Sequence, residues 1–131
     1  MKLDTTAKEN KLNKLFSELN EMYHYGECWD GYSAIAPIPE IIETAKTFAE
    51  VLVNEIPENS EPKVMIDSSS EISFYFNDRV NKNYIEITIF NTKEYGFFVD
   101  TNYEKLYGKD DISVNYLDKD LLNSIILMHK V

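Results

Sequence analysis

The segment NYIEITIF (residues 83–90) is the most informative part of the chain for its fold. Alternate positions place Ile85, Ile87 and Ile89 on one side of an extended chain and Tyr84, Glu86, Thr88 and Phe90 on the other. β-Branched residues at every second position predict a β-strand whose isoleucine side faces a hydrophobic core. The segments before and after it can be assigned relative to this strand.

Segments with the same alternation precede and follow this strand. Residues 63–66 and 72–76 come before it, and EYGFFVD (residues 94–100) comes after a short turn. Because these connections are too short for the crossovers of a parallel sheet, we expect an antiparallel meander of four to five strands. Residues 101–111 are predicted to form a polar loop, and residues 112–114 a short last strand.

Two amphipathic helices are predicted ahead of the sheet. Apolar residues recur at three- and four-residue steps over residues 6–23 and again over residues 39–54. Thr6 and Glu9 have the spacing of a capping box, which would start the first helix. Pro39 suits the first position of the second helix, where its missing N–H has no intrahelical partner to lose.

A short helix over residues 121–128 is predicted to close the chain, with Asp118 as its N-cap. The order is then two N-terminal helices, an antiparallel meander and a C-terminal helix, which is an α+β fold. A length of 131 residues fits one hydrophobic core. We therefore predict a single α+β domain over residues 1–131.

The charge of the chain limits the classes of partner. Acidic residues outnumber basic ones 23 to 13, for a formal net charge of -10. Such a charge repels phosphate backbones and anionic lipids, and no segment is locally basic, so direct nucleic-acid and membrane binding are not expected. Two interpretations remain: an acidic surface that keeps the protein soluble, or an acidic face that docks onto a basic partner and can cover its nucleic-acid groove.

The cysteine content and the first residues bear on the compartment. A chain with one cysteine cannot form an intrachain disulfide. The start MKLDTTAKEN is too polar for a signal peptide, and no apolar run approaches the roughly 18 residues of a membrane span. Cytoplasmic residence is therefore expected.

Few residues suggest chemistry. His24 and His129 are the only histidines, and no catalytic motif connects them. The chain has no glycine-rich phosphate loop, and the acidic pair Asp110 and Asp111 lacks the ligand spacing of a calcium loop. One cysteine and two histidines are too few for a zinc site. We therefore predict no catalytic residue, no cofactor and no metal site.

The only tryptophan and the only cysteine lie together in the segment GECWDGYSA, ahead of the second predicted helix. Asp-Gly favours a turn, in which Gly31 can take positive φ and the Asp30 carboxylate can accept bonds from backbone amides. Trp29 and Tyr32 are expected to pack against the helices and the sheet, and Cys28 to lie buried beside Trp29. Trp29, Asp30, Gly31 and Tyr32 are therefore predicted to form a structural corner.

The same block carries a resemblance to a known group of proteins. The order of elements and the motif WDGYSA (residues 29–34) resemble a loose group of small bacterial and phage-borne proteins, mostly of unassigned function. Their first block usually reads Gly-Trp-Asp-Gly-Tyr-Gly-Ala, whereas this chain has Ser33 in place of the second glycine. It also has Ile38 where that group has a capping serine, and Ser70 where it has an Asp-Gly turn, in a strand block at residues 62–76.

The resemblance implies a role rather than a reaction. The proteins that this chain resembles are encoded near toxin–antitoxin or other mobile-element genes, and the resemblance therefore implies an inhibitory or partner-binding role. It brings no catalytic residues to this chain.

The second face of the sheet is the predicted interface. Aromatic residues fall on both faces, so if the helices cover one face, the other is an aromatic patch suited to a protein partner or a homodimer contact. The alternative is that the C-terminal helix covers this second face. The candidate interface residues are Tyr75, Tyr84, Glu86, Phe90, Phe98, Asp110 and Asp111.

We therefore predict a non-enzymatic, acidic protein-binding module that inhibits or restrains a basic partner protein. Such a module would be antitoxin-like or a phage-encoded inhibitor of a host defence system. The alternative is a small-ligand-binding protein or an enzyme with a cleft near Trp29, Tyr32 and Cys28.

Overall fold

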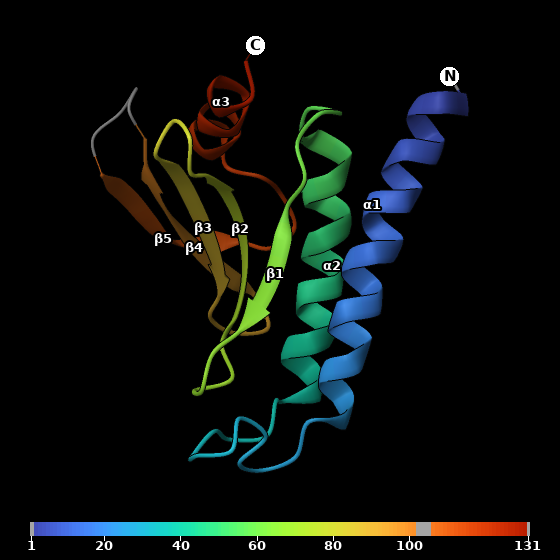
Figure 1. The fold of residues 1–131 in the computed structure, drawn as a ribbon, viewed down its shortest axis with the longest axis vertical. Coiled ribbons are helices and arrows are strands. Elements are labelled where there is room, and N and C mark those ends of the chain that lie inside the picture. Colours follow the sequence, from blue (N-terminus) through green and yellow to red (C-terminus); the bar gives the residue numbers. More distant parts are fainter. Residues whose placement is uncertain (1, 102–105, 131) are drawn as a thin grey trace.

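The computed structural model describes residues 2–101 and 106–130, with the backbone alone for residues 2–5. It shows the expected α+β fold, with helices before and after a five-stranded antiparallel sheet (Figure 1). The elements are α1 (Lys2–Glu21), the 3₁₀ helix η1 (Met22–His24), α2 (Pro39–Glu55), β1 (Lys63–Ile66), β2 (Ile72–Asp78), β3 (Asn83–Ile89), β4 (Glu94–Asp100), β5 (Tyr107–Ser113) and α3 (Lys119–Met128).

The sheet is the predicted meander, because every strand pairs with its neighbour in the sequence, in the order β1-β2-β3-β4-β5. The isoleucines of β3 lie on the buried face, as expected. Ile87, for example, is paired with Phe74 of β2 and Phe97 of β4, and all three side chains are buried. We call this buried side of the sheet the inner face and the opposite side the outer face.

All three helices lie on the inner side of the sheet. Phe48 of α2 packs against Phe74 and Tyr95, with ring centroids 5.7 and 4.5 Å apart. The helix α1 packs on α2, beside which it lies in Figure 1, and it also contacts β1. The C-terminal helix lies on the same side, where His129, directly after α3, places its ring 5.5 Å from the ring of Phe76. The outer face is therefore left without a covering helix in the described part of the chain.

Residues at both ends of α2 account for its bounds. Pro39 occupies the first turn of α2, and Ile38 at the N-cap offers no side-chain bond. At the other end, Lys8 and Lys11 of α1 donate from Nζ to the carbonyl oxygens of Asn54 and Pro57, over 3.3 and 3.2 Å. These lysines satisfy carbonyl groups at the negative end of α2, which is a favourable place for a cation.

The predicted start of the first helix is wrong. The helix α1 already begins at Lys2, so Thr6 and Glu9 lie inside it and do not form a capping box. The residues ahead of Thr6 contain no glycine or proline, and nothing local therefore stops the helix from extending toward the N-terminus.

The last strand is longer than predicted. Tyr107–Ser113 forms β5, so Asp110 and Asp111 belong to a strand rather than to a loop. Gly, Lys and Asp are poor strand formers, but β4 pairs with this strand on both sides of Asp110 and Asp111. The pairing is irregular beside Tyr95 and Phe97, and Asp111 has a φ of 60°, which are the marks of a β-bulge. Residues 102–105 of the predicted loop lie outside the described residues.

Tyr95 joins the sheet to the C-terminal helix. Its side chain is fully buried, and its hydroxyl donates to the Tyr116 carbonyl (3.1 Å) and accepts from the Asp118 N–H (2.9 Å). Burial raises the pKa of Tyr95 to about 12. The Asp118 carboxylate in turn accepts from the N–H groups of Asp120 and Leu121, which confirms it as the N-cap of α3.

Removing the Tyr95 hydroxyl should therefore destabilise the protein. In Tyr95→Phe, the Tyr116 carbonyl and the Asp118 N–H both lose their bonds to the hydroxyl, and we expect a loss of about 1–3 kcal/mol in the free energy of unfolding. Urea denaturation followed by circular dichroism measures this loss. Tyr116→Phe is the control, because the Tyr116 side chain is exposed. Equal stability of the two variants would contradict this role of Tyr95.

Candidate protein-interaction surface

Three strands bring the candidate interface residues together on the outer face. Tyr75 of β2, Glu86 of β3 and Phe98 of β4 are direct cross-strand partners and form one row across the sheet. Neighbouring strands lie about 4.8 Å apart, so these side chains stand next to one another. The Tyr84 ring lies between the two aromatic rings of the row, with centroids 6.2 Å from Tyr75 and 5.7 Å from Phe98.

We call Tyr75, Tyr84 and Phe98 the aromatic patch. Tyr75 and Tyr84 are partly buried by their contacts, and Phe98 is 36% exposed. Because the helices lie on the inner face, none of them contributes to covering these rings. A cluster of solvent-facing aromatic rings on an open sheet is a common feature of interaction surfaces.

A carboxylate lies within the aromatic patch. The Tyr84 hydroxyl donates to Glu86 Oε1 over 2.7 Å, and the Thr88 hydroxyl lies 3.5 Å from Oε2. Thr88 Oγ1 is in turn 2.8 Å from Ser73 Oγ on β2. Burial raises the pKa of Tyr84 above its ordinary value, and the hydrogen bond to Glu86 and the charge of Glu86 raise it further. Glu86 is therefore held in one position by polar neighbours on two strands.

Phe90 and Asp110 extend the surface beside the patch. The side chain of Phe90 is 46% exposed, and together with Asp110 it fills the space above Gly96, where a side chain would otherwise stand. Phe90, Asp110, Glu86 and Phe98 help to line a shallow groove of about 270 Å³. Asp111 is not part of this surface, because it lines a separate groove beside the turn at residues 92–93.

The charged side chains at the outward-facing strand positions are mainly acidic. Glu86, Glu94, Asp100 and Asp110 face outward, whereas Lys63 at the end of the Tyr75 row is the basic residue among the described positions of this face. The structure thus brings six of the seven candidate interface residues onto one face and places them among acidic neighbours.

The WDGY segment forms the predicted turn. Gly31 has a φ of 83°. One oxygen of the Asp30 carboxylate accepts from the backbone N–H groups of Tyr32 and Ala34, over 2.9 and 3.3 Å. Trp29 donates from Nε1 to the Ile35 carbonyl over 3.0 Å.

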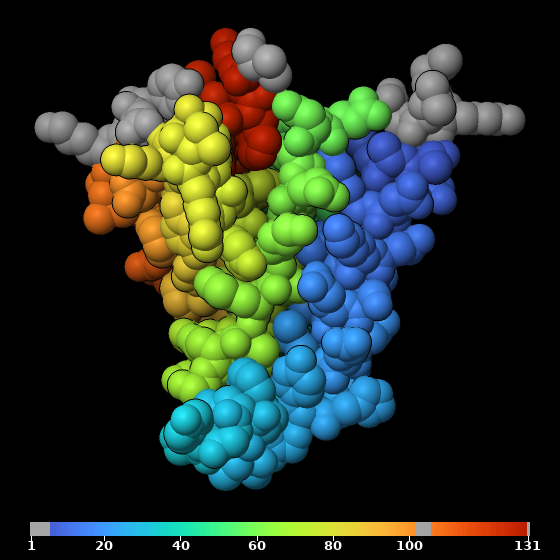
Figure 2. Space-filling model, in the orientation of Figure 1, coloured from blue at the N-terminus to red at the C-terminus, as the bar shows by residue number. Residues whose placement is uncertain are grey.

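This corner is attached to the turn between β1 and β2. The Ile35 N–H donates to the Ser68 carbonyl over 3.2 Å, and the Ser70 hydroxyl donates to the Ile35 carbonyl. Ser70 has a φ of 60°, a conformation that favours glycine. Figure 2 shows the α1–α2 connection packed at one end of the molecule against the β1–β2 turn. The corner therefore fixes the helix pair to the end of the sheet.

Two predictions for the corner are wrong. Tyr32 is 83% exposed and does not pack on the core, and Cys28 is exposed rather than buried beside Trp29. The Trp29 ring stacks instead on Tyr25, with centroids 5.0 Å apart. Since the turn is held by Asp30 and by backbone bonds, the side chain of Tyr32 is free to project into solvent.

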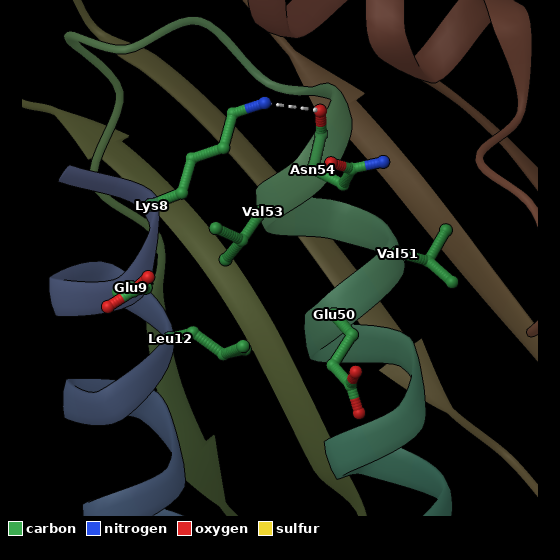
Figure 3. A pocket seen from close by; sticks show the side chains of 7 residues that line it. All are labelled: Lys8, Glu9, Leu12, Glu50, Val51, Val53 and Asn54. Atoms are coloured by element: carbon green, nitrogen blue, oxygen red, sulfur yellow. Dashed lines mark hydrogen bonds between the residues drawn. The ribbon is translucent and has the colours of Figure 1, made fainter. Parts of the chain in front are cut away.

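Another groove lies between α1 and α2. It measures about 570 Å³ and is lined by Leu12, Val53, Glu50 and Lys8, among others. Figure 3 shows Lys8 reaching from α1 to the Asn54 carbonyl of α2. The residues of the alternative cleft (Trp29, Tyr32 and Cys28) line neither this groove nor those on the outer face and beside β5.

Away from the outer face, Lys109 forms ion pairs with Asp118 and Asp120 over 3.2 and 2.7 Å at the start of α3. His129 places Nδ1 2.8 Å from the Ile125 carbonyl at the end of α3. Among the residues that the structure describes, no group of three or more His, Cys, Asp and Glu side chains could hold a metal ion. None of the described helices combines the length and the apolar character of a membrane-spanning segment.

Comparison with known proteins found no matching family model, no matching curated protein and no matching solved structure. The resemblance of the WDGYSA block to small bacterial and phage-borne proteins therefore stays a prediction.

The two glycines of the corner segment should respond differently to substitution. A Cβ at either Gly26 or Gly31 would meet no atom within 4 Å, but only Gly31 has a positive φ. We expect Gly31→Ala to lower the free energy of unfolding by about 1–2 kcal/mol through backbone strain alone. Gly26→Ala should be neutral or slightly stabilising, because it restricts the unfolded chain. Equal urea midpoints for the two variants would show that the turn is not strained by a side chain.

Tyr84 should make the stability of the protein depend on alkaline pH. Because its pKa is raised in the folded state, native Tyr84 keeps its proton at a pH where the unfolded chain loses it, above about 10. The contribution of Tyr84 to the free energy of unfolding is then complete below about pH 10 and is lost as the pH rises further. The urea midpoint should therefore decrease between about pH 9 and about pH 11, and this decrease should be smaller in Tyr84→Phe than in the native protein. A parallel loss in both proteins would show that Tyr84 is not the group responsible.

Proposed function

We propose that this protein is an acidic, non-enzymatic protein-binding module that restrains a basic partner protein through the outer face of its sheet. The observation that carries the proposal is the aromatic patch with the Glu86 carboxylate among its rings, on a face that no described helix covers. Aromatic residues are enriched in the centres of protein interfaces, where they contribute much of the binding energy.

The acidic surroundings support a basic partner. The net charge of -10 and the outward-facing Glu94, Asp100 and Asp110 produce a field that attracts a positively charged surface. Many basic protein surfaces bind nucleic acid through phosphate contacts. A module that covers such a surface would block that binding, and this is the inhibitory role that we propose, antitoxin-like or as a phage-encoded inhibitor of a host defence system.

A second copy of the chain is a less favourable occupant of the same face. In a twofold dimer each surface meets its own copy, so the two Glu86 carboxylates and their acidic neighbours would be brought together. Like charges facing each other across an interface are repulsive. We therefore expect the protein to be monomeric on its own and to keep the outer face free for another protein.

The experiment compares two tyrosine variants. Tyr84 lies in the aromatic patch, and Tyr32 projects from the corner at the end of the molecule. Tagged native protein and the Tyr84→Ala and Tyr32→Ala variants are used to capture partners from host extract at low salt. A recovered partner should bind Tyr84→Ala at least about tenfold more weakly than the native protein, and Tyr32→Ala equally well.

Salt provides a second test of the same complex. Binding should weaken as the salt concentration rises from about 50 to about 200 mM, because screening reduces the attraction between oppositely charged faces. Circular dichroism of both variants checks that they remain folded. Loss of binding in Tyr32→Ala with retention in Tyr84→Ala would reject the outer face and would move the site to the corner.

A further inference from the structure

The Glu86 carboxylate has an unusual setting for a surface acid. Glu86 is flanked by Tyr75 on β2 and Phe98 on β4. The ring of Tyr84, which is also on β3, lies between the rings of these two residues. The carboxylate is thus surrounded by aromatic rings and faces solvent on an uncovered sheet. Aromatic faces beside an oriented carboxylate are a setting that can attract a cationic ligand.

The Glu86 carboxylate is held in place but still has free hydrogen-bond acceptor positions. The bonds from Tyr84 to Oε1 and from Thr88 to Oε2 use one acceptor position on each oxygen. An ionised carboxylate has about four acceptor positions, so about two remain for a ligand. Glu86 is fixed in one geometry by groups of the protein itself, which lowers the entropic cost of binding a donor there.

Glu86 has no cationic partner in the part of the chain that the structure describes. Among the described residues, no lysine, arginine or histidine forms an ion pair with Glu86. Lys63 faces the same side but lies on β1, two strands away from β3. Two strand spacings amount to about 10 Å. The carboxylate of Glu86 therefore has hydrogen-bond donors around it, but no positive charge among the described residues balances it.

We propose that the Glu86 site receives an arginine side chain from the basic partner, an inference that rests on the proposed function. A guanidinium group is planar, stacks on aromatic faces and donates two parallel hydrogen bonds to a carboxylate. The rings of Tyr75, Tyr84 and Phe98 offer such faces, and the free acceptor positions of Glu86 offer such bonds. A lysine ammonium is more strongly hydrated and cannot stack in this way, so it fits the site less well.

The first experiment uses peptides of defined chemistry. The ¹H–¹⁵N spectrum of the full chain is titrated with acetyl-Gly-Arg-Gly-amide, and with the same peptide carrying lysine or citrulline in place of arginine. Citrulline keeps the planar shape of arginine without its charge. We expect shift changes centred on Tyr84, Glu86 and Phe98, an affinity at least about tenfold higher for arginine than for lysine, and no saturable binding of citrulline.

Two charge-matched variants test the carboxylate itself. Glu86→Gln removes the charge and keeps an oxygen that can accept from Tyr84, so the fold should be preserved. Glu50→Gln makes the same change in net charge on α2, in the helix layer away from the outer face. The arginine peptide should bind Glu86→Gln at least about tenfold more weakly, and Glu50→Gln as it binds the native protein.

Several outcomes would overturn the inference. Equal binding of the arginine and lysine peptides would show a general cation site, and unchanged binding by Glu86→Gln would show that the carboxylate is not used. If a partner is lost in Tyr84→Ala while the arginine peptide fails to bind, the proposed function stands and the arginine inference is wrong. If sedimentation shows a dimer that Tyr84→Ala dissociates, a second copy occupies the face and both proposals are wrong.

Discussion

Phe48 of α2 lies against Phe74 and Tyr95 of the sheet, and this contact holds the central helix on the inner face. Its ring lies 5.7 and 4.5 Å from theirs, and all three side chains are fully buried. Aromatic side chains contribute large apolar areas to a core and prefer such tilted arrangements. The contact places α2 on the inner face, and α1 then packs on α2 as a further layer. The sheet is therefore covered from one side.

Tyr95 extends this constraint to the other end of the chain. Its hydroxyl binds the segment before α3 through Tyr116 and Asp118. The same buried ring that contacts Phe48 thus also holds the start of the C-terminal helix on the inner face. Because α3 is held there, it is unavailable to cover the outer face. The helices thus cover the inner face alone because of buried contacts, and the residues that face solvent do not determine this arrangement.

The open face and the corner illustrate two different uses of aromatic residues. In the corner, Trp29 and the turn at Gly31 connect the helix pair to the β1–β2 turn, and the most conspicuous motif of the sequence acts mainly as a support. On the outer face, the rings of Tyr84 and Phe98 surround an oriented carboxylate at Glu86. Rigid rings and a fixed acid together favour recognition of a cation at little entropic cost.

Local patterns alone predicted the α+β class, the bounds of β1 and β4, the turn at Gly31 and the Asp118 N-cap. Each of these depends on groups a few residues apart, which a sequence displays directly. The extent of β5, the exposure of Tyr32, the face that the helices cover and the neighbours of Glu86 emerged only from the folded structure. These features depend on strand register and on contacts between distant segments, and a local pattern contains no information about which distant segment will pack against it.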